Sequence, residues 1–184
     1  MSDARERVLL HLLAHSVRRG DFTLKSGRPS SWFIDAKQTV LAPEAMVDLA
    51  TLVLERIPTE ATAIGGLTMG ADGVAFVTAG VAATRGRDLR AFSVRKEEKD
   101  HGGGGRIAGV LAPGDRVVIT EDTVTRGASQ LEAAHVVTGL GAEVVLILAV
   151  VDRGGTAAAR AAEFGWRFDA LFTARDLGFD YEGA

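Results

Sequence analysis

The spacing of apolar residues along the chain predicts two N-terminal helices separated by an arm. Apolar side chains recur at helical spacing over residues 4–19, and Gly20 is expected to end that helix. A second helix is expected over residues 43–57, because it begins with a proline and repeats the helical pattern. Between them, residues 22–35 hold two short apolar pieces around a Ser-Gly-Arg-Pro-Ser turn, which predicts a hairpin-like arm.

Beyond Pro58, short apolar runs alternate with helical segments. Strands are expected at residues 61–65, 89–94, 116–120, 143–151 and 167–172. One helix is expected between the first two strands, ending near residue 85, and two more at residues 129–140 and 156–164. This alternation predicts an α/β fold, a mostly parallel twisted sheet flanked by helices. Because no repeat or change of composition divides the chain, residues 1–184 are expected to form a single domain, with residues 1–60 contributing helices and a small N-terminal hood.

Composition narrows the class of protein only modestly. The chain is 47% hydrophobic and 24% charged, which is typical of a globular protein, and its net charge of −3 does not favour a nucleic-acid partner. The chain has no cysteine, which excludes disulfides and thiolate chemistry. The N-terminus lacks the apolar run of a signal peptide and no segment is apolar enough to span a membrane, so a cytoplasmic protein is expected. His11 and His15 have zinc-binding spacing, but no third ligand is evident.

Four loops follow expected strands and collect most of the unusual residues. They cover residues 65–72, 95–106, 121–129 and 152–155. In open parallel sheets, ligands bind beyond the carboxyl ends of the strands. These loops are therefore expected to form the functional site.

Residues 117–129, VVITEDTVTRGAS, predict a site for a phosphorylated sugar. Glu121 and Asp122 end a buried strand, and carboxylates there can accept hydrogen bonds from vicinal hydroxyls. The backbone amides of residues 125–129 precede a helix, where free N–H groups and the helix dipole favour a phosphate. The alternative is a capped strand-to-helix turn, with Ser129 as N-cap and Glu132 completing a capping box.

A basic, glycine-rich segment follows another expected strand. Its cationic side chains could neutralise a diphosphate, and they are Arg95, Lys96, Lys99 and His101. Four glycines follow them and suit a closing lid. A solvated charged hairpin is the alternative interpretation.

Several of these segments resemble one family. Residues 117–129 resemble the signature of phosphoribosyltransferases that use phosphoribosyl diphosphate, departing from it at Arg126, where Thr is more usual, and at Ala128, where Gly is common. RKEEKDHG (residues 95–102) resembles the corresponding loop of orotate phosphoribosyltransferases. LKSGRPSSWFID, GGLTMGAD and VDRGG resemble that family's N-terminal arm, ribose-phosphate-side loop and orotate-side loop, in family order.

The resemblance implies the type I phosphoribosyltransferase fold and transfer of a phosphoribosyl group to orotate, giving orotidine 5′-phosphate and diphosphate in de novo pyrimidine (UMP) biosynthesis. It further implies Mg²⁺ held through substrate oxygens, with no direct protein ligand, and a homodimer in which Arg95 reaches the neighbouring subunit's site.

The resemblance also implies residue roles. Catalytic roles fall to Lys99, His101 and Asp122. Phosphoribosyl diphosphate would contact Lys25, Arg95, Lys96, Lys99, His101, Glu121, Asp122, Thr123, Val124, Thr125, Arg126, Gly127, Ala128 and Ser129. Orotate would contact Phe33, Ile34, Thr125 and Arg153, with Arg153 pairing its carboxylate.

Two rival functions stay open at this point. One is a phosphoribosyltransferase for a purine or another pyrimidine base. The other is a non-catalytic phosphoribosyl diphosphate sensor, a class that usually adds a nucleic-acid-binding region. Turnover of orotate, turnover of a different base, or binding without turnover would distinguish the three.

Overall fold

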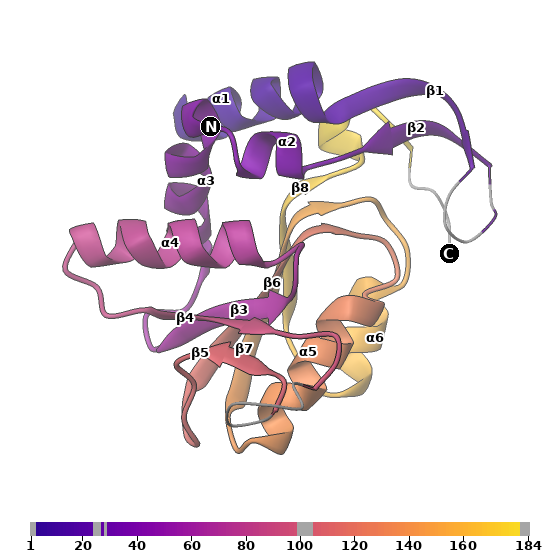
Figure 1. Ribbon diagram of the computed structural model, residues 1–184. Coiled ribbons are helices and arrows are strands. Elements are labelled where there is room, and N and C mark those ends of the chain that lie inside the picture. The colour runs from indigo at the N-terminus through magenta and orange to yellow at the C-terminus, as the bar shows by residue number, and fades with distance from the viewer. Residues whose placement is uncertain (1–2, 24–26, 28, 99–104, 181–184) are drawn as a thin grey trace.

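The computed structural model describes residues 3–23, 27, 29–98 and 105–180 (Figure 1). Two helical segments, a hairpin and two further helices form the N-terminal third: α1 (Asp3–His11), η1 (Leu12–Ser16), β1 (Val17–Thr23), β2 (Pro29–Ile34), α2 (Lys37–Val40) and α3 (Pro43–Arg56). Strands and helices then alternate: β3 (Ala63–Leu67), α4 (Asp72–Thr84), β4 (Arg90–Val94), β5 (Ile107–Gly109), β6 (Arg116–Val124), α5 (Ala128–Gly139), β7 (Glu143–Asp152), α6 (Ala157–Glu163), β8 (Phe168–Thr173) and η2 (Arg175–Leu177).

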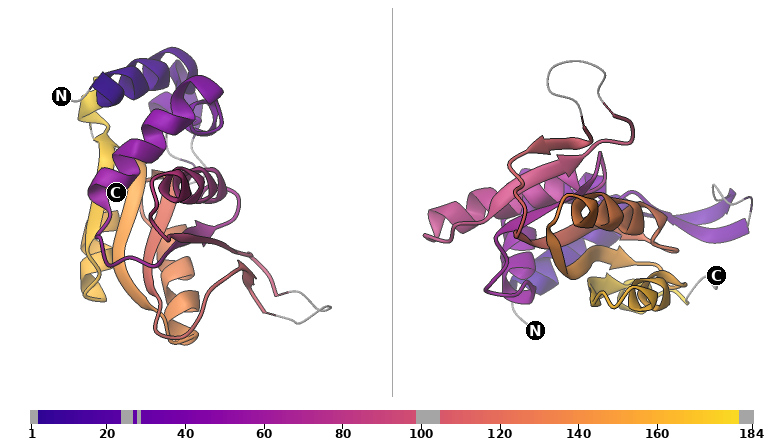
Figure 2. Two further views of the ribbon diagram at one scale, coloured as in Figure 1. Left: turned by 90° about the vertical axis from the view of Figure 1, so that its left-hand side faces the viewer. Right: turned by 90° about the horizontal axis from the view of Figure 1, so that it is seen from below.

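The main sheet has six strands in the order β5-β4-β3-β6-β7-β8, and only β5 runs antiparallel to its neighbour. Helices α5 and α6 cover one face, while α4 and the N-terminal helices cover the other (Figures 1 and 2). The predicted α/β class, a mostly parallel sheet flanked by helices, is confirmed.

Strand β6 shows how the sequence produces two cores. Alternate side chains of a strand point to opposite faces of the sheet. Val117 and Ile119 therefore pack in the cluster that contains Leu131 of α5. Val118, between them, packs in the cluster that contains Val74 of α4. The run of three β-branched residues is buried on both faces, as expected for a central parallel strand.

The first helix is shorter than predicted. The predicted helix over residues 4–19 is wrong beyond Ser16, because Val17 already pairs with Ile34 in the antiparallel β1–β2 hairpin. The Ser16 carbonyl accepts a hydrogen bond from the Asp35 amide at 3.0 Å, which closes the base of this hairpin. The predicted hairpin-like arm is confirmed, and it extends beyond the rest of the chain in Figure 2.

Helix α2 and strand β5 were not predicted, and β6 continues through Glu121 and Asp122 instead of turning after Thr120. Among the described residues, no helix combines the length and apolar character needed to cross a membrane.

The order of the strands fixes where a ligand can bind. Strand β4 lies on one side of β3, and the later strand β6 lies on its other side. Such a switch point opens a crevice at the carboxyl ends of the two strands. The pairing of β6 with β3 ends at Ile119, whereas its pairing with β7 continues as far as Val124 and Asp152. Four residues predicted to bind phosphoribosyl diphosphate lie along this extension: Glu121, Asp122, Thr123 and Val124.

Candidate active site

Two adjacent buried carboxylates lie at the switch point. Glu121 and Asp122 are 7% and 5% exposed. The Glu121 carboxyl lies directly against Gly70, the glycine that follows Met69 in the GGLTMGAD loop after β3. A methyl group on Gly70 would overlap Glu121 Oε1 and would approach Asp122 Oδ1 to 2.9 Å. The glycine therefore lets the loop after β3 close against the acidic pair.

Lys37, a residue that the sequence analysis missed, binds one of these carboxylates. Its Nζ lies 2.5 Å from Asp122 Oδ2, while Asp122 Oδ1 accepts a hydrogen bond of 2.8 Å from the Thr123 amide. Although partial burial opposes the charged form, the hydrogen bond to Asp122 and the nearby carboxylates raise the pKa of Lys37. Lys37 therefore brings a positive charge from α2 in the hood to the acidic pair.

Burial changes the charge of the pair. It raises the pKa of Glu121 to about 8, and the negative charge of Asp122 acts in the same direction. Near neutral pH, Glu121 is then largely protonated while Asp122 is paired with Lys37. The centre therefore carries little net charge, which suits the approach of a polyanionic ligand.

A pH-dependent difference in stability between the wild type and Glu121→Gln is expected. Between about pH 4.5 and pH 8, Glu121 loses its proton in the unfolded state but keeps it in the folded state. Its contribution to folding is therefore complete at low pH and is lost as the pH rises through this window. Glutamine cannot ionise, so the melting temperature of Glu121→Gln should rise relative to that of the wild type between pH 5 and pH 8. A difference that stays constant over this range would contradict the raised pKa.

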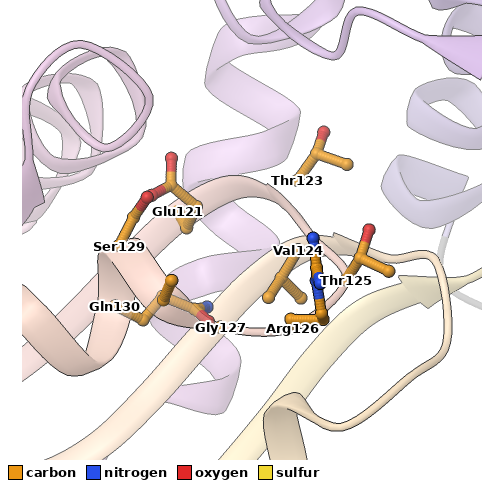
Figure 3. A pocket seen from close by; sticks show the side chains of 9 residues that line it. Glu121, Thr123, Val124, Thr125, Arg126, Gly127, Ser129 and Gln130 are labelled. Carbon is orange, nitrogen blue, oxygen red and sulfur yellow. The ribbon is translucent and has the colours of Figure 1, made fainter. Parts of the chain in front are cut away.

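A pocket of about 300 Å³ opens over the loop between β6 and α5. It is lined by Glu121, Thr123, Val124, Thr125, Arg126, Gly127, Ala128, Ser129 and Gln130. In Figure 3, Glu121, Thr123 and Thr125 point to one side of this loop. Val124 is instead buried with Ala149 and Ala157. The structure thus brings Glu121 and the predicted phosphate residues around one cavity, while Asp122 is not part of its lining.

Gly127 lets the loop enter α5 directly. It is the residue before the helix and has φ +72°, a left-handed conformation that favours glycine. The predicted N-cap is wrong: Ser129 lies inside the helix, and no side chain caps its start. The capping box is absent as well, because Glu132 pairs with Arg106. The exposed backbone N–H groups at this helix start suit a phosphate.

Two buried polar groups at the pocket have no hydrogen-bond partner among the described residues. They are Thr123 Oγ1 and Gln130 Nε2. Buried polar groups are usually satisfied, so a polar ligand would complete this lining. Gln130 was not predicted, because a glutamine within a helical stretch carries no local signal of binding.

Arg153 lies beside the loop between β6 and α5, residues 125–127, which is called the phosphate loop after its predicted ligand. Its amide donates a 2.8 Å hydrogen bond to the carbonyl of Val124, continuing the β6–β7 pairing. A methyl group on Gly155 would come within 2.5 Å of the Thr125 carbonyl, so this glycine lets the two loops touch. The Arg153 side chain is 6% exposed and stacks on the arm, with Cζ 4.3 Å from the ring centre of Trp32.

The arm presents its two predicted orotate residues differently. Phe33 is 38% exposed, and its ring centre lies 5.7 Å from that of Phe22. Ile34 is buried in the main core with Trp32, because successive side chains of β2 face opposite sides. Contact of Phe33 and Ile34 with a base stays a prediction.

The basic loop is only partly described. Lys25, Lys99 and His101 lie outside the described residues, so their predicted roles are untested. Lys96 is exposed, and Arg95 donates a hydrogen bond of 3.1 Å to the Ile107 carbonyl within its own hairpin. The use of Arg95 in a neighbouring subunit's site stays a prediction.

The acidic pair fits a cation that arrives with its ligand better than a resident metal. The described residues contain no group of three or more His, Cys, Asp or Glu side chains placed to hold a metal. Glu121 and Asp122 supply hard oxygen donors, but Lys37 already occupies Asp122 Oδ2. Mg²⁺ commonly takes most of its ligands from substrate phosphates and water. The two N-terminal histidines have a structural environment, since His11 Nδ1 lies 3.0 Å from Thr39 Oγ1.

This sheet, with its hood and its phosphate loop after β6, is the architecture of a type I phosphoribosyltransferase. No protein-family model matches the chain. An orotate phosphoribosyltransferase of Rhodopirellula baltica is 35% identical over 97% of this chain and 98% of its own length. One from Streptomyces coelicolor is 42% identical over 83% of this chain and 85% of its own.

A solved structure agrees with these relatives. Mycobacterium tuberculosis orotate phosphoribosyltransferase, in complex with 5-phospho-α-D-ribosyl 1-diphosphate, has a TM-score of 0.79 and 32% identity, covering 96% of this chain and 99% of that one. The chain belongs to the orotate phosphoribosyltransferase family.

Proposed function

We propose that this protein transfers the phosphoribosyl group of phosphoribosyl diphosphate to orotate, forming orotidine 5′-phosphate and diphosphate in de novo pyrimidine biosynthesis. The observation that carries the proposal is that three features meet at one switch point. The acidic pair, the phosphate loop and the Arg153 loop lie together there, in a chain of this family.

The donor is held through its sugar and its 5-phosphate. Vicinal ribose hydroxyls donate hydrogen bonds to the carboxyls of Glu121 and Asp122. The 5-phosphate lies against the amides of residues 125–129, where the helix start supplies N–H donors and a partial positive charge. The Gln130 amide and the Thr123 hydroxyl, which have no partner among the described residues, are placed to add donors.

The chemical step breaks the bond between the anomeric carbon and the diphosphate oxygen and forms one from orotate N1 to that carbon, while the proton on N1 is lost to the departing diphosphate or to water. The bonding electrons leave with the diphosphate, so positive charge develops on the sugar. The Asp122 carboxylate stabilises that charge. Lys99 and His101 act on the departing diphosphate, with Lys25, Arg95 and Lys96 as further cationic contacts. Mg²⁺ would be held through the substrate's diphosphate and ribose oxygens, and it would supply positive charge for the leaving group.

The acceptor is recognised through its carboxylate. Arg153 pairs with this group, since a guanidinium can donate two parallel hydrogen bonds to it. Thr125 contacts the base from the phosphate loop, and Phe33 and Ile34 contribute from the arm. A base without a carboxylate would leave Arg153 without this partner.

Three further features belong to the proposal. The 184 residues form one domain, with residues 1–60 as its hood, and two copies form a homodimer in which Arg95 serves the neighbouring site. The reaction takes place in the cytoplasm.

The proposal is tested by mixing the protein with Mg²⁺, phosphoribosyl diphosphate and orotate and following the loss of orotate absorbance. We expect turnover with orotate and little with uracil, hypoxanthine or adenine at equal concentration. Turnover of a purine without turnover of orotate would contradict the acceptor assignment. Binding of phosphoribosyl diphosphate without turnover of any base would contradict an enzymatic function.

A further inference from the structure

The guanidinium of Arg153 is held in a stack of four planar groups. Arg153 Cζ lies 4.3 Å from the ring centre of Trp32, and the Trp32 and Phe179 rings are 4.4 Å apart and inclined by only 5°. Arg19 Cζ lies 4.4 Å from the ring centre of Phe179. Because two groups at this separation cannot share one ring face, the order is Arg153, Trp32, Phe179, Arg19.

Three separate parts of the chain supply this stack. Arg19 and Trp32 come from β1 and β2 of the arm, where they face each other in the hairpin register. Arg153 follows β7, and Phe179 follows η2 near the C-terminal end of the described residues.

The backbone fixes the position of Phe179. Gly178 has φ +78° and turns the chain, and the Phe179 amide then donates a 3.0 Å hydrogen bond to the Ala174 carbonyl. Leu177 is buried in the core beside this turn. Phe179 is therefore anchored to the body of the protein, where it meets Trp32, a residue of the arm that is buried in the main core.

Trp32 also holds Arg153 through its backbone. Arg153 Nη2 lies 3.3 Å from the Trp32 carbonyl and 3.4 Å from Ser30 Oγ. Any movement of Trp32 therefore moves both the face on which the guanidinium stacks and an acceptor for one of its N–H groups. A bidentate pair with a carboxylate tolerates little error in angle, so the orientation of Arg153 matters for binding.

From this geometry we propose that Phe179 is a positioning residue for the acceptor: it holds Trp32 against Arg153, and thereby sets the protein's affinity for the carboxylate of the base. The inference rests on the proposed function, because it assumes that Arg153 binds that carboxylate. It assigns the segment after η2 to acceptor recognition, although Phe179 itself lies one stacked ring away from Arg153.

The test compares Phe179→Leu, which keeps apolar volume but removes the ring, with Phe179→Tyr, which keeps the ring. The matched control is Phe164→Leu. Phe164 stacks on the other tryptophan, Trp166, at 5.1 Å, and Trp166 packs against the other core cluster, the one that contains Leu131 of α5. We expect Phe179→Leu to raise the KM for orotate about tenfold, because an aromatic stacking contact is worth up to about a factor of ten. The KM for phosphoribosyl diphosphate should change less than twofold.

Phe179→Tyr and Phe164→Leu should both resemble the wild type in both KM values. A second readout is the quenching of Trp32 fluorescence by orotate, measured in a Trp166→Phe background. The orotate concentration at half-maximal quenching should rise by the same factor in Phe179→Leu. If Phe179→Leu folds poorly, Arg19→Met removes the outer end of the stack at an exposed position and should give a smaller shift of the same kind.

Equal increases in both KM values, or a lower melting temperature with an unchanged KM for orotate, would show a purely structural role and overturn the inference. Its failure is distinct from failure of the proposed function. If the wild type turned over no orotate, the function would be wrong. If the wild type were active but Phe179→Leu bound orotate normally, only the positioning role would be wrong.

Discussion

Replacement of Asp122 by asparagine is expected to lower kcat/KM by roughly 10²–10³-fold, the usual cost of removing one preorganised electrostatic contact. Asp122 is 5% exposed at the end of β6, and both of its oxygens are held, one by Lys37 and the other by the Thr123 amide. Asparagine keeps the shape but removes the charge that we propose stabilises the developing positive sugar. The measurement is orotate consumption at saturating Mg²⁺, with both substrates varied.

The matched control is Asp169→Asn, which removes a carboxylate from an exposed ion pair with Arg56. Exposed pairs contribute little, so its kcat/KM should be unchanged. A double variant identifies the cause of the Asp122 effect. If Asp122→Asn fails only because Lys37 loses its partner, adding Lys37→Met will restore activity. If the carboxylate itself stabilises the sugar, the double variant will stay as slow as Asp122→Asn. Normal turnover in Asp122→Asn would contradict the assignment of Asp122.

The parts of the fold that follow from local pattern were predictable from the sequence. Val117 to Ile119 form an apolar run of β-branched residues, and such runs between helical segments indicate central parallel strands. The order of the loops then places the acidic pair and Arg153 at one edge of the sheet. Neither the strand run nor the loop order depends on contacts between distant residues.

The errors arise where distant contacts override local preference. The helical pattern of the first segment continues past Ser16, but pairing of Val17 with Ile34 draws the chain into a strand. Ser129 and Glu132 have the spacing of a capping box, yet the helix starts directly after Gly127 and Glu132 pairs with Arg106. For Val17 and for Glu132, a partner far along the chain competes successfully with a local signal.

Lys37 shows the same limit at the site itself. It lies 85 positions before Asp122, in a segment whose composition gives no indication of a binding residue. Only the folding of α2 over the carboxyl end of β6 brings the two charges together. The stack that contains Phe179 is equally invisible in the sequence, because its four members come from three separate segments.

Replacing Arg153 by methionine should lower kcat/KM for orotate by roughly 10²–10³-fold, equal to about 3–4 kcal/mol and within the usual cost of breaking a buried charged pair. Methionine retains much of the apolar stem, so the change removes mainly the guanidinium. The effect should fall on the acceptor, because Arg153 contacts the arm and lies beside the phosphate loop without entering the lining of the phosphate pocket. Affinity for phosphoribosyl diphosphate should therefore stay close to that of the wild type.

A base that lacks the carboxylate provides the sharper measurement. Turnover of uracil, however slow, should be nearly the same in Arg153→Met as in the wild type, so the preference for orotate over uracil should collapse. Arg153→Lys should recover little, because an ammonium cannot form the bidentate pair or stack in the same way on Trp32. Arg56→Met, which removes the guanidinium of the exposed pair with Asp169, controls for a general loss of positive charge. If Arg153→Met lost activity with both bases equally, Arg153 would be supporting the fold of the site, and the carboxylate of orotate would have to be recognised elsewhere.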